Sequence, residues 1–206
     1  MSDDSLQDPA SIRHDGTTVG TGRASRRWTF VTIFVGFAAL AYLCDQLTKI
    51  WVTSTMAEGQ KTPVIPGLLQ WYYIRNSGAA FSIGEDFTWL FTLIMVGVAV
   101  FIVVIARRIG SVWWAIGLGL LLGGALGNLT DRLFRPPSFG MGHVVDFISF
   151  PNFAIFNMAD MGVVGGVITI CILTLMGVPL HGNKEDTAAT ADPAAATDTE
   201  TGTDND

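Results

Sequence analysis

The chain has 206 residues, of which 50% are hydrophobic and only 15% are charged, whereas a soluble domain carries about 25% charged residues. This composition argues against a soluble domain. The formal net charge of -6 arises in the two ends of the chain, so it says nothing about the partners of the remainder, and no basic surface for nucleic acid is indicated.

The two ends of the chain, residues 1–22 and 185–206, are polar and acidic and contain too few apolar residues to bury a core. We expect both to be disordered tails. Residues 23–184 carry eleven bases and seven acids and form the expected folded domain. The two cysteines and three histidines show no spacing typical of metal ligands, so we expect no metal site.

Four apolar stretches of spanning length, about 20 residues, predict four transmembrane helices. They are residues 28–44, 87–106, 109–130 and 161–183. The first is not a cleavable signal peptide, because it has no small-residue cleavage site and 27 residues precede it. We expect an all-α membrane protein with four transmembrane helices.

Basic residues near the ends of the spans predict the orientation, because cytoplasmic loops carry an excess of Lys and Arg. They are Arg23, Arg26, Arg27, Arg107, Arg108 and Lys184. Both termini are therefore expected in the cytoplasm, and residues 49–86 and 131–153 are expected outside it.

Within the first outer segment, residues 62–74 are apolar, aromatic and rich in β-formers, with Pro63, Pro66 and Gly67 marking turns. This pattern predicts a small β-like cradle on the membrane surface, and residues 131–153 are expected to form an interfacial loop. Trp71, Tyr72 and Tyr73 suit the headgroup layer. They could form an aromatic belt or a platform for a substrate, and the pattern favours neither.

Acids at membrane depth are costly and therefore informative. Four of them gather at the expected outer ends of the spans: Asp45 ends the first, Asp131 follows the third, and Asp146 and Asp160 accompany the fourth. If the fourth helix begins near residues 151–153, Asp160 lies about 10–13 Å along it. Asp146 lies in the apolar stretch HVVDFISF.

Two carboxylates that converge in apolar surroundings titrate as a coupled pair, which provides an acid and a base together. Asp146 and Asp160 are the candidates, and the arrangement is the one used by aspartic proteases. A Ser–Lys pair is less favoured, because Lys49 is four residues after Asp45 and would form an ion pair with it if the helix continues. A Cys–His pair has no support, because nothing brings Cys44 near His143.

Polar residues that could hold these acids surround them. Asn76 and Gly78 belong to a turn, Asn128, Asp131 and Arg132 close the third span, and Asn157 precedes Asp160 by three residues. Arg132 can offer a forked donor to a carboxylate. Alternatively, Asp131 and Arg132 form a structural cap or ion pair. Gly123, Gly124 and Gly127 favour close helix packing, and His143 is interpreted as a loop histidine.

Five ordered motifs together resemble the lipoprotein signal peptidases (signal peptidase II) of bacteria. They are DQLTK (45–49), NSGAAFS (76–82), GGALGNLTDR (123–132), VVDF (144–147) and FNMAD (156–160). The resemblance covers residues 29–177. Small departures are Met161 after the last motif and the segment RPPS at 135–138.

The resemblance implies an intramembrane aspartic endopeptidase that removes the signal peptide from prolipoproteins, on the N-terminal side of a cysteine carrying diacylglyceryl. It implies Asp146 and Asp160 as catalytic residues. It also implies a set of residues that position substrate or stabilise the site: Asp45, Lys49, Asn76, Gly78, Asn128, Arg132 and Asn157, to which we add Asp131 from its place beside Arg132.

Further expectations concern partners and location. The resemblance implies no metal or organic cofactor, and inhibition by globomycin-type compounds. We expect a monomer in the bacterial cytoplasmic (inner) membrane, in contact with membrane lipid, with its active site near the extracytoplasmic face and no nucleic-acid partner. Two other classes stay open: a small carrier or proton-coupled channel, since intramembrane acids also mark ion pathways, and a structural membrane partner.

Overall fold

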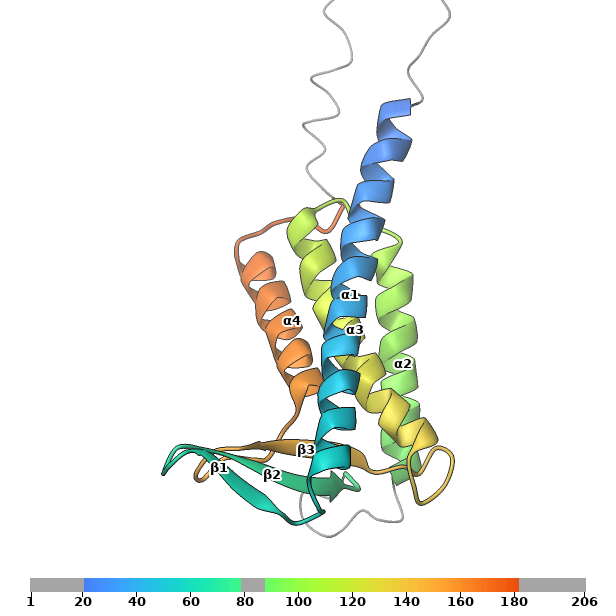
Figure 1. The fold of residues 1–206 in the computed structure, drawn as a ribbon. Coiled ribbons are helices and arrows are strands. Elements are labelled where there is room, and N and C mark those ends of the chain that lie inside the picture. The colour runs from blue at the N-terminus through green and yellow to red at the C-terminus, as the bar shows by residue number, and fades with distance from the viewer. Residues whose placement is uncertain (1–20, 79–87, 182–206) are drawn as a thin grey trace, which may run out of the picture.

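The computed structural model describes residues 21–78 and 88–181 (Figure 1). Its elements are α1 (Thr21–Thr55), β1 (Lys61–Ile65), β2 (Leu69–Asn76), α2 (Thr88–Ala106), α3 (Val112–Phe134), β3 (Val144–Ser149) and α4 (Met158–Leu175). Most of the expected tails, together with Ala79 to Ser82 of the second motif, lie outside the described residues.

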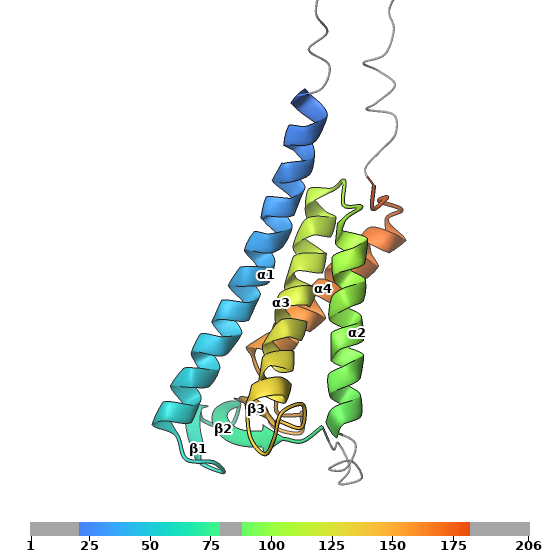
Figure 2. The ribbon, with the colours of Figure 1, turned by 90° about the vertical axis from the view of Figure 1, so that its right-hand side faces the viewer.

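All four helices are long and apolar enough to cross a membrane. The sequence-based prediction of four spans and a mostly helical fold is therefore confirmed, and the chain is a multi-pass membrane protein. Helix α3 lies in the centre and contacts α1, α2 and α4. The small sheet lies at one end of the bundle, whereas α1 begins and α4 ends at the opposite end (Figures 1 and 2).

Helix α1 continues well beyond the expected end of the first span at residue 44. It ends at Thr55, so Asp45 and Lys49 lie inside it instead of at its boundary. Both side chains are fully buried and form an i,i+4 ion pair with 2.8 Å between Lys49 Nζ and Asp45 Oδ2. The paired charges let the helix continue, and the expected ion pair is confirmed. Likewise, Asp131 lies within α3 and does not follow it.

Glycines bring α3 close to its neighbours. A Cβ atom on Gly123 would collide with the carbonyl oxygen of Ala38 in α1, and one on Gly124 would collide with the carbonyl oxygen of Ala159 in α4. Small residues permit such backbone approach in membrane helices, where packing and not hydrophobic burial drives association. The close-packing interpretation of these glycines is confirmed.

The three strands form an antiparallel sheet in the order β1-β2-β3, which confirms the expected cradle. Ile74 pairs with Asp146, and Asn76 pairs with Val144. Side chains alternate along a strand, so Asn76 and Asp146 share a face. On the other face Val145 and Phe147 join Tyr73 and Val52 of α1 in a buried cluster, which fixes the sheet against the bundle.

Helix α4 begins later than expected, at Met158 and not near residues 151–153. Phe156 is held in extended conformation by backbone hydrogen bonds with Ile148, with N···O distances of 2.8 and 3.0 Å. Asn157 then caps the helix through its side chain. Asp160 therefore lies in the first turn of α4 instead of two turns inside it.

The helix also ends earlier, at Leu175, where the sequence predicted residue 183. Gly177 adopts a φ of 69°, which is typical of the residue that ends a helix.

We expect the substitution Gly124→Ala to lower the free energy of unfolding by about 1–3 kcal/mol, the range for overpacking of a tight interior. The reason is that the new methyl group meets backbone, which cannot turn aside as a side chain can. Thermal unfolding in detergent measures the change. Gly165→Ala in α4 is the matched control, because nothing lies within 4 Å of its Cβ position. Equal stability of the two variants would contradict the packing argument.

Candidate active site

Asp146 lies in the middle of β3 with only 2% of its surface exposed. Both of its carboxylate oxygens accept hydrogen bonds from amide side chains. Asn157 Nδ2 donates to Oδ1 at 2.6 Å, and Asn76 Nδ2 donates to Oδ2 at 2.8 Å. Asn76 is itself oriented by the backbone N–H of Gly78, 2.8 Å from its Oδ1, where a φ of 96° favours glycine.

Burial raises the pKa of Asp146 to about 6 from an ordinary value of 3.8. The hydrogen bonds from Asn76 and Asn157 lower this pKa, because they stabilise the ionised carboxylate, while the nearby charge of Asp160 raises it. The carboxyl group thus holds its proton to higher pH than an exposed aspartate, and the two aspartates influence each other electrostatically.

Asp160 occupies the first turn of α4 and is less buried than Asp146. It forms a reciprocal capping box with Asn157: the Asp160 N–H donates to Asn157 Oδ1, and the Asn157 N–H donates to Asp160 Oδ2, both at 3.0 Å. Asn128 Nδ2 of α3 donates to the other carboxylate oxygen at 2.8 Å. Asn157 therefore contacts both aspartates, and it links strand β3 to helix α4.

Lys49 has no exposed surface, and its ammonium group contacts three buried side chains of the site. Its Nζ lies 2.8 Å from Asp45 Oδ2 and 2.9 Å from Asp131 Oδ2. The same ammonium group donates to Asn128 Oδ1 at 2.9 Å. Its three donors are thereby used by groups from α1 and α3.

Asp45 and its neighbour Gln46 connect α1 to the beginning of α4. Asp45 Oδ1 accepts the backbone N–H of Ala159 at 2.9 Å, so a carboxylate from another helix satisfies a donor in the first turn of α4. Gln46 Nε2 donates to Asp45 Oδ2 at 3.0 Å and to the Gly127 carbonyl at 3.1 Å. Sequence reasoning missed Gln46, and its position next to Asp45 was the available signal.

Asp131 connects α3 to the strand that carries Asp146. Its Oδ2 accepts the backbone N–H of Val145 at 3.1 Å, and its Oδ1 forms an ion pair with Arg135. Arg135 was interpreted only as part of a loop departure, although its i,i+4 spacing from Asp131 indicates this pair. Asp131 therefore pairs with Lys49 and Arg135, and the ion pair with Arg132 that the sequence offered as one alternative does not form.

Arg132, which can offer a forked donor to a carboxylate, donates to a backbone carbonyl instead. Among the described residues, its Nη1 donates to the Gly142 carbonyl at 3.1 Å, and its Nε has no hydrogen-bond partner. Its Nη2 lies beside Gly78, where a Cβ atom would be 3.0 Å away. Arg132 points away from the carboxylate of Asp131 because the two residues are adjacent on α3 and face different neighbours. Asp131 faces Lys49 and Arg135, whereas Arg132 lies beside Gly78, which follows β2.

His143 lies in the loop between α3 and β3, as expected. Within residues 21–78 and 88–181, no group of three or more His, Cys, Asp or Glu side chains could hold a metal ion. Of the aromatic residues in β2, Trp71 packs on Trp51 and Phe147 with ring centroids 6.0 and 5.8 Å away.

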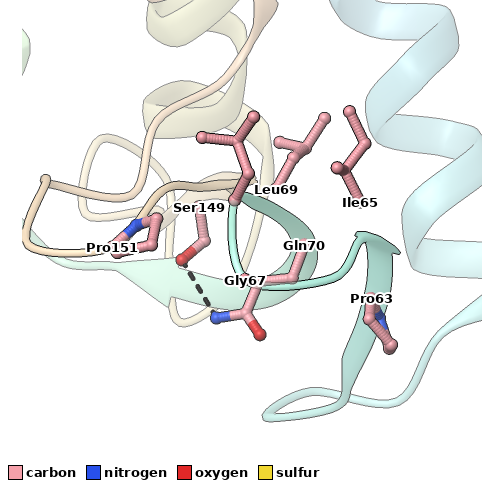
Figure 3. Close-up of a pocket in the computed structure, with 8 residues that line it drawn as sticks. Pro63, Ile65, Gly67, Leu69, Gln70, Ser149 and Pro151 are labelled. Carbon is pink, nitrogen blue, oxygen red and sulfur yellow. Dashed lines mark hydrogen bonds between the residues drawn. The ribbon is translucent and has the colours of Figure 1, made fainter.

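A separate hollow of about 240 Å³ lies under the β1–β2 turn and is lined by Pro63, Ile65, Leu69, Gln70, Ser149 and Pro151 (Figure 3). Gln70 Nε2 donates to Ser149 Oγ at 3.3 Å across it. Ser149 is three residues beyond Asp146 on β3, so its side chain belongs to the opposite face of the sheet. The hollow is therefore distinct from the pair of aspartates.

The structure thus joins Asp45, Lys49, Asn76, Gly78, Asn128, Asp131, Asp146, Asn157 and Asp160 in one hydrogen-bonded network, with Arg132 at its edge. Two carboxyl groups meet at Asn157, one deeply buried and one partly open. Such a pair can hold one proton, so that one member accepts a proton while the other donates one.

We expect the substitution Lys49→Met to lower the free energy of unfolding by about 3–5 kcal/mol, because Asp45 would remain buried without its cation and Asp131 would keep only Arg135. Thermal unfolding in detergent measures the loss. The control is Arg75→Gln, which removes an ion pair between Arg75 and Glu58. The two side chains are 40% and 54% exposed, so the loss of this pair is expected to lower the free energy of unfolding by less than about 1 kcal/mol. A loss for Lys49→Met no larger than the control would contradict the central role of Lys49.

Known proteins resemble this chain over most of its length. Lipoprotein signal peptidase of Leifsonia xyli subsp. xyli is 50% identical over 156 residues, which cover 75% of this chain and 72% of the relative. The lipoprotein signal peptidase of Mycobacterium avium is 44% identical over 162 residues, covering 79% of this chain and 87% of the relative.

Two solved structures, both described as bacterial membrane enzymes, share the fold. The first has a TM-score of 0.60 and 32% identity, and the alignment covers 72% of this chain and 93% of the other. The second has a TM-score of 0.61 and 30% identity, with 80% and 93% covered. The family model described as signal peptidase (SPase) II matches residues 37–176, a range that contains the whole network around Asp146 and Asp160, and the chain belongs to the signal peptidase II family.

Proposed function

We propose that this chain is an aspartic endopeptidase in which Asp146 and Asp160 form the catalytic pair. One observation carries the proposal: both carboxylates receive hydrogen bonds from Asn157, one through its side chain and the other through its backbone. Asp146 lies on strand β3 and Asp160 lies on helix α4, and Asn157 is hydrogen-bonded to both. Such a shared arrangement supports coupled acid and base roles.

The proposed reaction uses water as nucleophile and forms no covalent intermediate. Asp160 lies in the first turn of α4, where the helix dipole favours negative charge, and it accepts a proton from water as the oxygen attacks the scissile carbonyl carbon. Asp146 holds the proton of the pair, polarises the carbonyl oxygen and then supplies a proton to the leaving amine. Asn76, Asn128 and Asn157 hold the two carboxylates in place.

The proposed substrates are prolipoproteins whose cysteine carries a diacylglyceryl group, with cleavage on the N-terminal side of that cysteine. Support comes from the relatives, which are named lipoprotein signal peptidases, and from the position of the pair where the sheet meets the membrane helices. A signal peptide can lie along the helices while its lipid chains stay in the bilayer. Globomycin-type compounds are expected to inhibit, and the enzyme is proposed to act as a monomer in contact with lipid.

The proposed orientation places both termini in the cytoplasm and the aspartates near the extracytoplasmic face of the bacterial inner membrane. Its support is the charge at the end of the bundle opposite the sheet, where Arg26, Arg27, Arg107 and Arg108 lie. Residues 23–184 are proposed as the peptidase domain, with residues 1–22 and 185–206 as tails.

We expect Asp146→Asn and Asp160→Asn each to lower the rate of cleavage by at least about a hundredfold, the lower end of what a general acid or base contributes. Cleavage of a purified diacylglyceryl-modified prolipoprotein in detergent measures the effect. An unlipidated substrate tests the need for the lipid.

Glu58→Gln is the matched control, because Glu58 is an exposed acid at the same end of the molecule and is expected to leave the rate unchanged. Thermal unfolding of each variant shows that the fold is kept. Cleavage by the Asp146→Asn/Asp160→Asn double variant at the wild-type rate would refute the proposed pair.

We expect kcat/KM to fall as the pH rises through about 6, the value to which burial raises the pKa of Asp146, because the pair then loses its one proton. The variant Asn76→Ala removes a donor that stabilises the ionised carboxylate, so the pKa rises and the alkaline limb moves to higher pH. A pH profile of the two enzymes tests this. An alkaline limb that does not move, or moves to lower pH, would contradict the role of Asn76.

A further inference from the structure

The end of α3 and the loop that follows it present two exposed aromatic side chains. Phe134, the last residue of α3, is 73% exposed, and Phe139 in the loop is 76% exposed. Their ring centroids lie 6.1 Å apart in an edge-to-face arrangement. The two rings therefore form one apolar unit, which we call the aromatic pair, and the rest of the described chain leaves it largely uncovered.

The loop that carries the aromatic pair is firmly held. The Gly142 N–H donates to the Arg132 carbonyl at 2.9 Å, and Arg132 Nη1 donates to the Gly142 carbonyl at 3.1 Å. Thr92 Oγ1 of α2 donates to the Gly140 carbonyl at 2.7 Å. A Cβ atom on Gly142 would collide with the carbonyl oxygen of Asp131. The loop backbone is thus packed against α2 and α3, and the exposure of the two rings is a built feature of the surface.

The spacing of exposed aromatic residues places the pair at the membrane boundary. Trp113 and Phe134 are exposed at the two ends of α3, about 32 Å apart along the axis at a rise of about 1.5 Å per residue. The exposed tryptophans Trp28 and Trp51 of α1 are about 35 Å apart by the same rise. Both spacings match a hydrocarbon core of about 30 Å with its two interfaces, where tryptophan is enriched.

The surroundings of the pair favour lipid as the partner. Figure 1 shows the loop beside the start of α2, at the sheet end of the bundle. Trp89 and Leu90 in the first turn of α2 are also exposed, so the pair continues the apolar surface that the spans present to the membrane. Arg135, which separates the two rings in sequence, forms an ion pair with Asp131. Exposed apolar patches of this kind mark interaction surfaces.

We propose that the aromatic pair inserts into the interfacial layer of the bilayer at the sheet end, where it contacts the glycerol and first methylene groups of phospholipids. Asp131 lies one turn before Phe134 on α3 and accepts the N–H of Val145, the neighbour of Asp146, at 3.1 Å. An anchor at the end of α3 therefore fixes the height of β3 relative to the membrane. The anchor does not depend on the proposed catalytic roles, because its contacts are with lipid.

Spin labelling of the full chain in phosphatidylcholine vesicles tests the proposal. A nitroxide label is attached at Ser138→Cys, next to Phe139, after replacement of the two native cysteines by Cys44→Ala and Cys171→Ala. The measurement is the ratio of label collisions with oxygen, which concentrates in lipid, to collisions with a water-soluble nickel chelate. We expect a ratio near that of a label at Val100→Cys, an exposed position inside the α2 span.

A label at Glu58→Cys provides the reference for water, because Glu58 is an exposed charged residue at the same end of the molecule. The double variant Phe134→Ser/Phe139→Ser is expected to shift the ratio at residue 138 to the value at residue 58. Leu175→Ser is the matched control, because it removes an 88% exposed apolar side chain at the opposite end and is expected to leave the ratio unchanged. Thermal unfolding in detergent shows that each variant keeps the fold.

Three results would overturn the proposal. A ratio at residue 138 equal to that at residue 58, with both rings present, would place the pair in water. Equal shifts for the double variant and for Leu175→Ser would indicate a movement of the whole chain in the membrane and not a local anchor. Spin–spin broadening that disappears on dilution with unlabelled protein would assign the aromatic pair to a contact between two copies of the chain.

Discussion

The arrangement of the site depends on one constraint, which is that the buried ammonium group of Lys49 must keep its partners. Each partner holds a different part of the molecule. Asp45 caps α4 through the Ala159 N–H, Asp131 holds β3 through the Val145 N–H, and Asn128 orients Asp160. A charge without partners is costly in an apolar interior, so satisfying Lys49 also sets the positions of the strand and the helix that carry the two aspartates.

Amides, and not cations, make the direct contacts with Asp146. Asn76 and Asn157 donate to its two oxygens, while Arg132 donates to the Gly142 carbonyl and Lys49 contacts Asp45, Asp131 and Asn128. An arginine paired directly with a carboxylate would lower its pKa strongly. Neutral donors fix the geometry of Asp146 while burial still raises its pKa to about 6, which suits the proton-holding role that we propose for it.

The two ends of the bundle differ in chemistry, and the membrane helices separate them. The sheet end combines buried acids with amides and one lysine, whereas the opposite end combines arginines with tryptophans and a cavity of about 590 Å³. Glycines in α3 permit close contact with α1 and α4 along the way. Close backbone packing between the central helices therefore joins the two ends of the bundle.

The sequence by itself determined the four spans, the cradle and the candidate pair Asp146 and Asp160, because apolar run length, strand-like alternation and acids in apolar surroundings are local signals. Most of the supporting candidate residues came instead from the resemblance of five motifs to signal peptidase II. It placed Asp45 and Asp131 at the ends of helices, since charge suggests a boundary. It placed Asp160 two turns inside α4, since that helix was expected to begin near residues 151–153. Only the tertiary structure decided otherwise: Lys49 forms ion pairs with two acids inside helices, and the pairing of Phe156 with Ile148 delays the start of α4 until after Asn157. The same is true of Arg132, whose hydrogen bond to the Gly142 carbonyl depends on how α3 and the following loop pack, and no local pattern specifies that packing.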